Sequence, residues 1–291
     1  LLGVVAGTES PDEAVATGLA VAKALGKQPV QAGNGFGFIG NRIYAAYRAS
    51  CEFMLEDGAL PHEVDEALKS FGFAMGPFAV ADMSGLDIAW RMRQQLGATR
   101  DPSDRYVQIP DRLCEMGRLG RKTGAGYYTY DEGGRPQRAP EVEALIAEAS
   151  DAKGIARRTL APQEIQQRAM AAIVNEAGLV LEEKIAARAS DIDVVLVNGY
   201  GFPRWLGGPL YWASQQDPEK LAADCAASAR RGGTFQEARG PDGRVDRRQR
   251  QGEELTSPPV SRRPCQTHCW EGRSISQLPS SPPPNRLRPR F

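Results

Sequence analysis

The 291-residue sequence contains no run of about 20 apolar residues, so it has no segment typical of a membrane-spanning helix. Its five cysteines are too few and too scattered for a disulfide framework, which favours a reducing compartment, and we expect the cytoplasm. Leu1 begins no signal peptide, and because it is not Met we expect the start of the protein to lie upstream. These absences exclude a membrane span and a disulfide scaffold.

Charge gives no sign of a polyanionic partner. The 36 basic residues equal the 36 acidic residues, so we expect no nucleic-acid partner. The charges are unevenly distributed along the sequence, because residues 239–291 are basic. They contain eleven arginines against five acids, together with nine prolines. Such a segment buries too little apolar area to fold, so we expect a disordered tail. Its composition is also typical of an out-of-frame end.

Apolar spacing predicts a mainly α-helical chain. We expect a helix beginning near Ser10, which is placed to cap it, and ending at Gly26. Further helices are expected, together with one short strand and an extended arm near Tyr127 to Tyr130. The expected helices span residues 38–55, 61–71, 88–96, 141–149 and 163–183, and the strand spans 28–32.

The sequence also repeats itself loosely. Residues 42–46 (RIYAA) match 168–172 (RAMAA) at a separation of 126 residues, and Gly76-Pro77 matches Gly208-Pro209 at 132. This ordered series predicts two copies of one helical unit that bury a shared face. Chance identity in alanine-rich helices is the alternative.

A literal G-x-G-x-x-G pattern runs from Gly35 to Gly40, after the strand and before the longest helix. A dinucleotide fingerprint also needs a second strand that ends in an acid about 20 residues later, and none is predicted here. Bulky Phe36 and Phe38 would crowd a pyrophosphate. We therefore interpret these glycines as letting the backbone enter the helix at an unusual angle.

Residues 34–42 (NGFGFIGNR) resemble the GFIxNR segment of the 3-hydroxyacyl-CoA dehydrogenase family. The resemblance extends over roughly residues 1–237. Residues 27–30 (KQPV) resemble the final strand of the family's NAD domain, and 118–128 (RLGRKTGAGYY) the end of its first helical repeat. Residues 190–193 (SDID) and 197–205 (VNGYGFPRW) resemble the second repeat of the multifunctional fatty-acid β-oxidation proteins.

The resemblance implies a mainly α fold with two tandem C-terminal helical repeats, preceded by the last helix and strand of a Rossmann domain. It implies a remnant of that domain at 1–33 and repeats at 34–134 and 135–238, ahead of the tail that composition predicts at 239–291. In the complete enzyme a 3-hydroxyacyl-CoA is oxidised with NAD, which we do not expect these residues to bind by themselves. A homo-oligomer is a further expectation.

Among the family's catalytic residues, the asparagine corresponds to Asn41, whose amide is suited to donate a hydrogen bond to the reacting oxygen. The alternative is that Asn41 only caps a helix start. The family's histidine falls upstream of residue 1, and its glutamate position is occupied by Gly3, which cannot orient an imidazole. We therefore expect the chain alone to be inactive.

Two other functions remain open. A non-catalytic helical module, binding acyl-CoA or forming a dimer, is favoured by Gly3. A sugar-acid dehydrogenase has similar architecture but does not explain the GFIxNR and NGYGFPR blocks.

Weaker candidate residues have ordinary interpretations. Trp205 and Trp212 are expected in the core. Arg121 and Lys122 are interpreted as a solvated pair rather than ligands of a CoA phosphate. The set Cys265, His268 and Cys269 lacks the second ligand pair of a closed zinc site.

Overall fold

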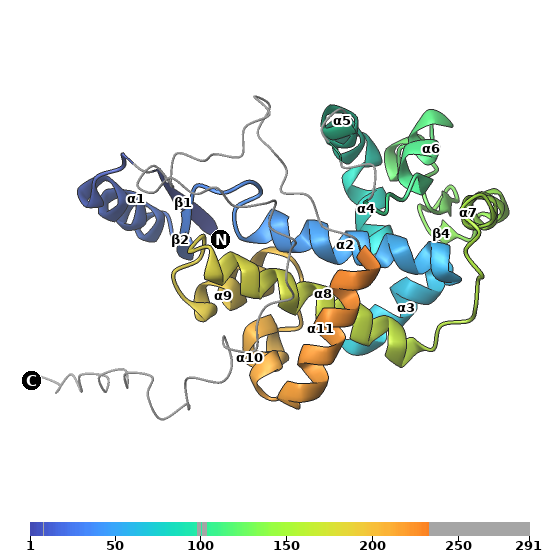
Figure 1. Cartoon of the computed structure of the whole chain (residues 1–291). Helices are drawn as coiled ribbons and strands as arrows, with labels where there is room; N and C mark the ends of the chain where they lie inside the picture. The colour runs from blue at the N-terminus through green and yellow to red at the C-terminus, as the bar shows by residue number, and fades with distance from the viewer. Residues whose placement is uncertain (8, 98–99, 101–103, 233–291) are drawn as a thin grey trace, which may run out of the picture.

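The computed structural model describes residues 1–7, 9–97, 100 and 104–232 (Figure 1). The predicted tail and the Cys265 set lie outside these residues. The described part is mainly helical, as predicted, and none of its helices is long and apolar enough to cross a membrane. It begins with two strands and a helix, which Figure 1 shows at one end of the molecule, followed by helices α2 to α11.

The first elements form a strand–helix–strand unit. Strand β1 (Leu2–Ala6) pairs in parallel with β2 (Pro29–Gly33), in a register that runs from Leu2↔Pro29 to Ala6↔Gly33. Helix α1 (Asp12–Ala24) connects the strands and packs on both. The expectation of a single strand near residue 30 was therefore wrong. The Ser10 cap was also wrong, because Ser10 Oγ instead accepts a hydrogen bond from the Gly7 N–H at 3.0 Å.

Proline marks the start of many helices. It occupies the first helical position, where its missing N–H costs nothing and its fixed φ suits a helix. Helix α3 has the predicted bounds, and α7 and α8 agree with their predictions to within one or two residues. The helices that begin with proline are α3 (Pro61–Phe71), α4 (Pro77–Ser84), α7 (Pro140–Asp151), α8 (Pro162–Glu182), α10 (Pro209–Ser214) and α11 (Pro218–Gly232).

The remaining elements include the long helix α2 and two short strands. The expected arm near Tyr127 contains strand β3, which pairs antiparallel with β4 and is followed by α7. Tyr127 and Tyr128 are buried beside it. The other bounds are α2 (Gly40–Asp57), α5 (Leu86–Gly97), α6 (Ile109–Glu115), η1 (Arg121–Thr123), β3 (Thr129–Tyr130), β4 (Pro136–Gln137), α9 (Ala189–Gly199) and η2 (Arg204–Leu206).

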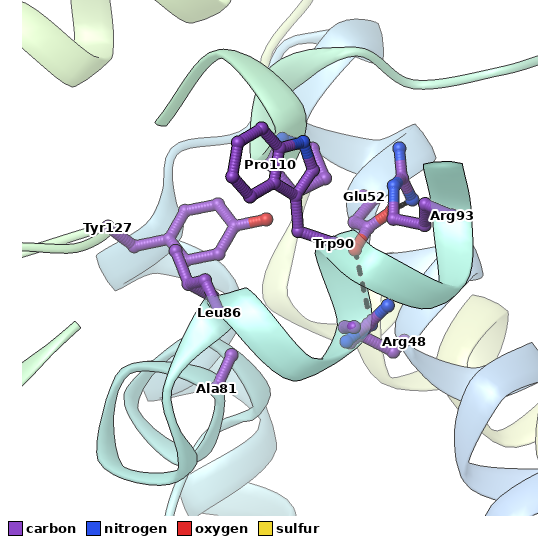
Figure 2. A pocket seen from close by; sticks show the side chains of 9 residues that line it. Arg48, Glu52, Ala81, Leu86, Trp90, Arg93, Pro110 and Tyr127 are labelled. Atoms are coloured by element: carbon purple, nitrogen blue, oxygen red, sulfur yellow. Dashed lines mark hydrogen bonds and ion pairs between the residues drawn. The ribbon is translucent and has the colours of Figure 1, made fainter. Parts of the chain in front are cut away.

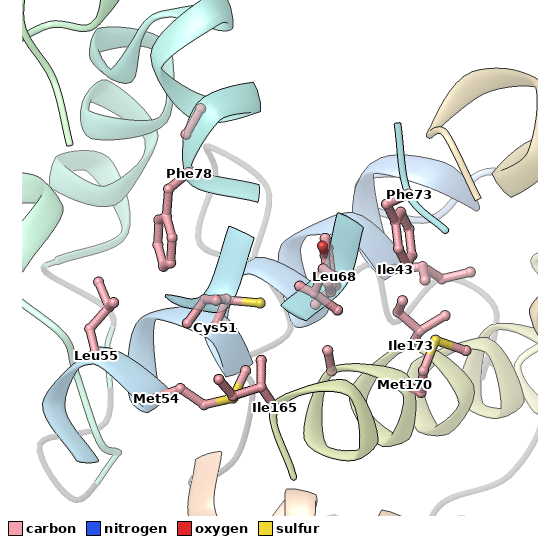
Figure 3. Packing of buried hydrophobic residues seen from close by; sticks show 14 of the residues in the cluster. Ile43, Cys51, Met54, Leu55, Leu68, Phe73, Phe78, Ile165, Met170 and Ile173 are labelled. Atoms are coloured by element: carbon pink, nitrogen blue, oxygen red, sulfur yellow. The ribbon is translucent and has the colours of Figure 1, made fainter. Parts of the chain in front are cut away.

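The core lies where α2 packs against α8 and α3 (Figure 3). Fully buried apolar side chains from the three helices meet there, and each such side chain contributes about 1.5–3 kcal/mol to folding. The labelled members of this cluster include Ile43, Cys51, Met54, Leu68, Ile165, Met170 and Ile173.

Ion pairs fix the two long helices at both ends. Arg42, near the start of α2, pairs with Glu183 just after α8 (2.5 Å). Arg168, near the start of α8, pairs with Asp57 at the end of α2 (2.5 Å). The helices are therefore antiparallel. Corresponding members of the two ion pairs lie 126 positions apart, because Arg42 corresponds to Arg168 and Asp57 to Glu183.

Candidate functional site

Asn41 lies in the first turn of α2 with its side chain exposed. Ile39 occupies the N-cap position, and no side chain caps this helix. The alternative interpretation of Asn41 as a helix cap is therefore not supported. Its carboxamide is instead held by a residue far away in the sequence.

That residue is Tyr200, which follows α9. The Tyr200 hydroxyl donates a hydrogen bond to Asn41 Oδ1 at 2.6 Å. The bond uses the acceptor atom of the amide and leaves the donor Nδ2 without a partner among the described residues. Sequence reasoning found Tyr200 only as part of a motif and gave it no role. A donor on a rigid helix with its hydrogens unused is the group that a developing oxyanion requires.

Arg42 is buried, whereas Asn41 beside it is exposed, and Arg42 anchors the site to α8. Its Nε donates to Glu176 at 2.5 Å, and its two terminal nitrogens donate to Glu183 at 2.5 and 3.0 Å. Burial would lower the pKa of the Arg42 guanidinium, but the Glu183 and Glu176 carboxylates outweigh it and raise that pKa. Arg42 is therefore a charged, immobile anchor directly beside Asn41.

The loop between β2 and α2 is held by the turn that follows α8. The Gly33 N–H donates to the Ile185 carbonyl at 2.8 Å, and a Cβ at Gly35 would overlap the Ile185 side chain. The backbone then turns through Gly37 and Phe38, with φ of +71° and +49°, before entering α2. This left-handed turn agrees with the predicted unusual helix entry.

Gly3, which the resemblance assigns to the family's glutamate position, lies on the exposed face of β1, paired with Val30 of β2. A Cβ at Gly3 would contact nothing within 4 Å. The structure thus offers room for a side chain there, but the chain supplies none.

A hollow elsewhere in the molecule lies between α2, α5 and α6 (Figure 2). Its charged groups are already paired: Glu52 binds Arg48 (3.2 Å) and Arg93 (3.3 Å), and Arg93 also binds Asp111 (2.9 Å). Trp90 and Tyr127 fill much of the remaining space. Because the charged groups of this hollow are already paired with one another, it is not the candidate site.

The weaker candidates behave differently from one another. Trp212 packs against the core as predicted, whereas Trp205 is 73% exposed and the expectation that it is buried was wrong. The Trp205 indole lies against Gly72, just after α3. Lys122 pairs with Asp87 at 2.5 Å. Within the described residues, no group of three or more His, Cys, Asp or Glu side chains is arranged to hold a metal ion.

Comparison with known proteins matches the segment that contains Asn41 to a family. Residues 37–130, which include Asn41, match the 3-hydroxyacyl-CoA dehydrogenase, C-terminal domain family. The predicted resemblance to the 3-hydroxyacyl-CoA dehydrogenases is confirmed. The crystal structure of the dehydrogenase part of multifunctional enzyme 1 from C. elegans is 28% identical with a TM-score of 0.57. The match covers 81% of this chain and 53% of that one.

Two curated relatives are named peroxisomal bifunctional enzyme. The Danio rerio protein is 42% identical over 234 residues, covering 76% of this chain and 33% of its own length. The Homo sapiens protein is 40% identical over 227 residues, covering 74% and 31%. This chain thus spans about a third of the length of the curated relatives that it matches.

The names of these relatives overturn one prediction. The cytoplasm was expected because the cysteines imply a reducing compartment and no targeting signal was identified. The relatives at 40–42% identity are named peroxisomal, and they point to the peroxisome instead. Cysteine content cannot distinguish these two compartments, because it gives no information about the targeting signal of a protein.

Proposed function

We propose that this chain supplies the helical half of a 3-hydroxyacyl-CoA dehydrogenase, in which Asn41 is a catalytic residue. The observation that supports this most is the Asn41 amide: it lies within the matched segment 37–130, is exposed, and has Nδ2 uncommitted while Oδ1 is held by Tyr200. In the oxidation of a 3-hydroxyacyl-CoA, the C3 hydroxyl oxygen becomes a carbonyl oxygen. Asn41 Nδ2 donates a hydrogen bond to that oxygen.

The family generally uses NAD, but the described residues do not fit this cofactor. The parallel sheet has only two strands, and the space beside Gly35 and Gly40 is occupied by Ile185 and Tyr200. A pyrophosphate needs that space to approach the backbone. We therefore assign no step of hydride transfer to these residues. Alone, the chain is proposed to be inactive, since Gly3 stands where the family has its glutamate.

The domain organisation proposed for this function has a strand–helix–strand piece at 1–33 and two helical repeats, at 34–134 and 135–238. Two ion pairs support the repeats. In one, Arg42 of the first repeat pairs with Glu183 of the second. In the other, Arg168 and Asp57, which lie 126 positions after Arg42 and 126 before Glu183, form the equivalent pair with the repeats exchanged. Each repeat then buries its long helix against the other. The second repeat is therefore proposed as a scaffold for the first.

The experiment is a chimera. The part of the Danio rerio enzyme that precedes its matching region is joined ahead of this chain, and Gly3→Glu is added. NADH formation from a 3-hydroxyacyl-CoA is followed by absorbance. Asn41→Ala is expected to lower kcat about 10²–10³-fold with little change in KM, the usual loss for one such donor.

Gln95→Ala, an exposed amide on α5, is the matched control and is expected to keep full turnover. If Asn41→Ala keeps full turnover as well, Asn41 is not catalytic.

The second candidate function is a non-catalytic helical module, which Gly3 favours. A chimera without Gly3→Glu separates the two. Turnover that returns only with the added glutamate indicates a dehydrogenase half that has lost one residue. A chimera that is inactive with and without the glutamate, although folded, indicates the module.

A further inference from the structure

The hydroxyl of Tyr200 and the amide of Asn41 meet although 159 residues separate them in the sequence. They also belong to different halves of the molecule: Asn41 lies in the first turn of α2, whereas Tyr200 directly follows α9. A contact of this kind needs the second half to be folded onto the first.

The side-chain amide of Asn41 ends in an acceptor, Oδ1, and a donor, Nδ2. Rotation about its last side-chain bond exchanges the positions of these two atoms. A tyrosine hydroxyl whose proton is directed at one position selects the orientation that places the acceptor there. In this structure that acceptor is Oδ1, so the two N–H groups of Nδ2 point away from Tyr200. An amide that is free to flip would for part of the time place its own oxygen next to the reacting oxygen. The two partly negative oxygens would then repel each other.

The ring of Tyr200 is itself fixed. It lies against the backbone of Gly40, where a Cβ would overlap the ring, and its centroid is 5.9 Å from that of Tyr44. Burial raises the pKa of the Tyr200 hydroxyl, so the group remains protonated and a donor at neutral pH. Gly40 thus gives room for the ring directly beside the amide that the hydroxyl binds.

We propose that Tyr200 is a positioning residue, which holds the Asn41 carboxamide so that Nδ2 alone faces the reacting oxygen. This inference rests on the proposed function of Asn41 and extends it to the second half of the chain. Tyr200 itself is not proposed to touch the substrate. It acts only through Asn41, and that property makes it testable.

The first measurement uses the full chain without any added domain. The side-chain amide signals of Asn41 are assigned by ¹⁵N NMR, with Asn41→Ala as the reference that lacks them. Tyr200→Phe keeps the ring against Gly40 and removes only the hydroxyl. It is expected to shift both Asn41 amide proton signals, with a melting temperature close to that of the parent chain. Tyr211→Phe, on an exposed tyrosine of α10, is the matched control and is expected to leave them unchanged.

The second measurement uses the chimera. Tyr200→Phe is expected to lower kcat about 5- to 10-fold, the effect of one neutral hydrogen bond, with KM unchanged. In the Asn41→Ala background the same change is expected to cost nothing further, because a residue that acts only through Asn41 has nothing left to position.

Unshifted amide signals, or full turnover of Tyr200→Phe beside a defective Asn41→Ala, would overturn this inference and leave the proposed function standing. An equal loss from Tyr200→Phe with and without Asn41 would overturn it too, since Tyr200 would then act by another route. If Asn41→Ala is fully active, the proposed function of Asn41 fails first and the inference fails with it.

Discussion

Asp65 and Asp193 make the same contacts in the two halves of the chain. Asp65 accepts hydrogen bonds from the backbone N–H groups of Phe78 and Ala79 (3.0 and 2.9 Å), at the start of α4. Asp193 accepts them from Leu210 and Tyr211 (2.7 and 3.2 Å), at the start of α10. Each of these helices begins with Gly-Pro, and a Cβ on either glycine, Gly76 or Gly208, would overlap the aspartate. Each carboxylate thus caps the start of a helix that lies 13 to 18 residues later in the sequence.

Removing either carboxylate is expected to destabilise the fold, by different amounts. Asp193→Ala leaves two helix-start donors without their acceptor and is expected to cost about 1–2 kcal/mol. Asp65→Ala is expected to cost about 3 kcal/mol, because Asp65 is more deeply buried and also accepts from the Tyr128 hydroxyl at 2.8 Å. Urea unfolding measures both values.

Glu132→Ala is the control for these substitutions. Glu132 is an exposed acid in the turn between β3 and β4, and its removal is expected to change stability by less than about 0.5 kcal/mol. If Asp65→Ala costs no more than this control, the carboxylate does not stabilise the start of α4.

Asp65 also makes stability depend on pH. Burial raises the pKa of its carboxyl from 3.8 to about 6, although the hydrogen bonds from Phe78, Tyr128 and Ala79 lower it. Between these two pH values the folded state keeps a proton that the unfolded state has released, so stability falls as pH rises. Below this range both states are protonated, and above it both are ionised.

Asp65→Asn is therefore expected to remove this fall of stability with rising pH. The difference in unfolding free energy between the parent chain and this variant should shrink from pH 4 to pH 6 and stay constant above that. Urea midpoints at pH 4, 5, 6 and 7 measure it. A difference that is constant over the whole range would show that the Asp65 carboxyl titrates normally.

Breaking the buried ion pair of Arg42 is expected to be costly. Arg42→Met leaves Glu176, which is 2% exposed, as an uncompensated charge and is expected to destabilise the chain by about 3–5 kcal/mol. Adding Glu176→Met removes that charge and should recover a large part of the loss. A double variant no more stable than Arg42→Met in urea unfolding would contradict the buried-charge explanation.

Gly3→Glu is expected to be tolerated. The position is exposed, and a Cβ there would meet nothing within 4 Å, so the change should alter stability by less than about 0.5 kcal/mol. Thermal unfolding of the full chain measures this. Gly76→Ala is the contrast, because its Cβ would overlap Asp65, and it should lower the melting temperature clearly. A large loss at Gly3 would mean that this face of β1 is covered.

Local signals in the sequence predicted several of the helices and missed contacts between distant residues. Helix α3 was predicted at its true bounds because Pro61 starts it and Gly72, with φ of +126°, ends it. Strand β1 was missed because its five residues, LGVVA, show no clear alternation of apolar and polar side chains. Asn41 came from a family resemblance, and its catalytic role is still a prediction. No single sequence indicates that Tyr200 would reach it.

The central position of α2 has a consequence during synthesis. The apolar face of α2 is complete once Asp57 has been made, but α8, which covers it, begins only at Pro162. At about 5–20 residues per second, the ribosome takes roughly 5–20 s to make the segment between them. For that interval the nascent chain carries an uncovered helix face, the kind of surface that chaperones bind. Pausing of translation within residues 58–161 would prolong this exposure, whereas pausing after residue 182 would not.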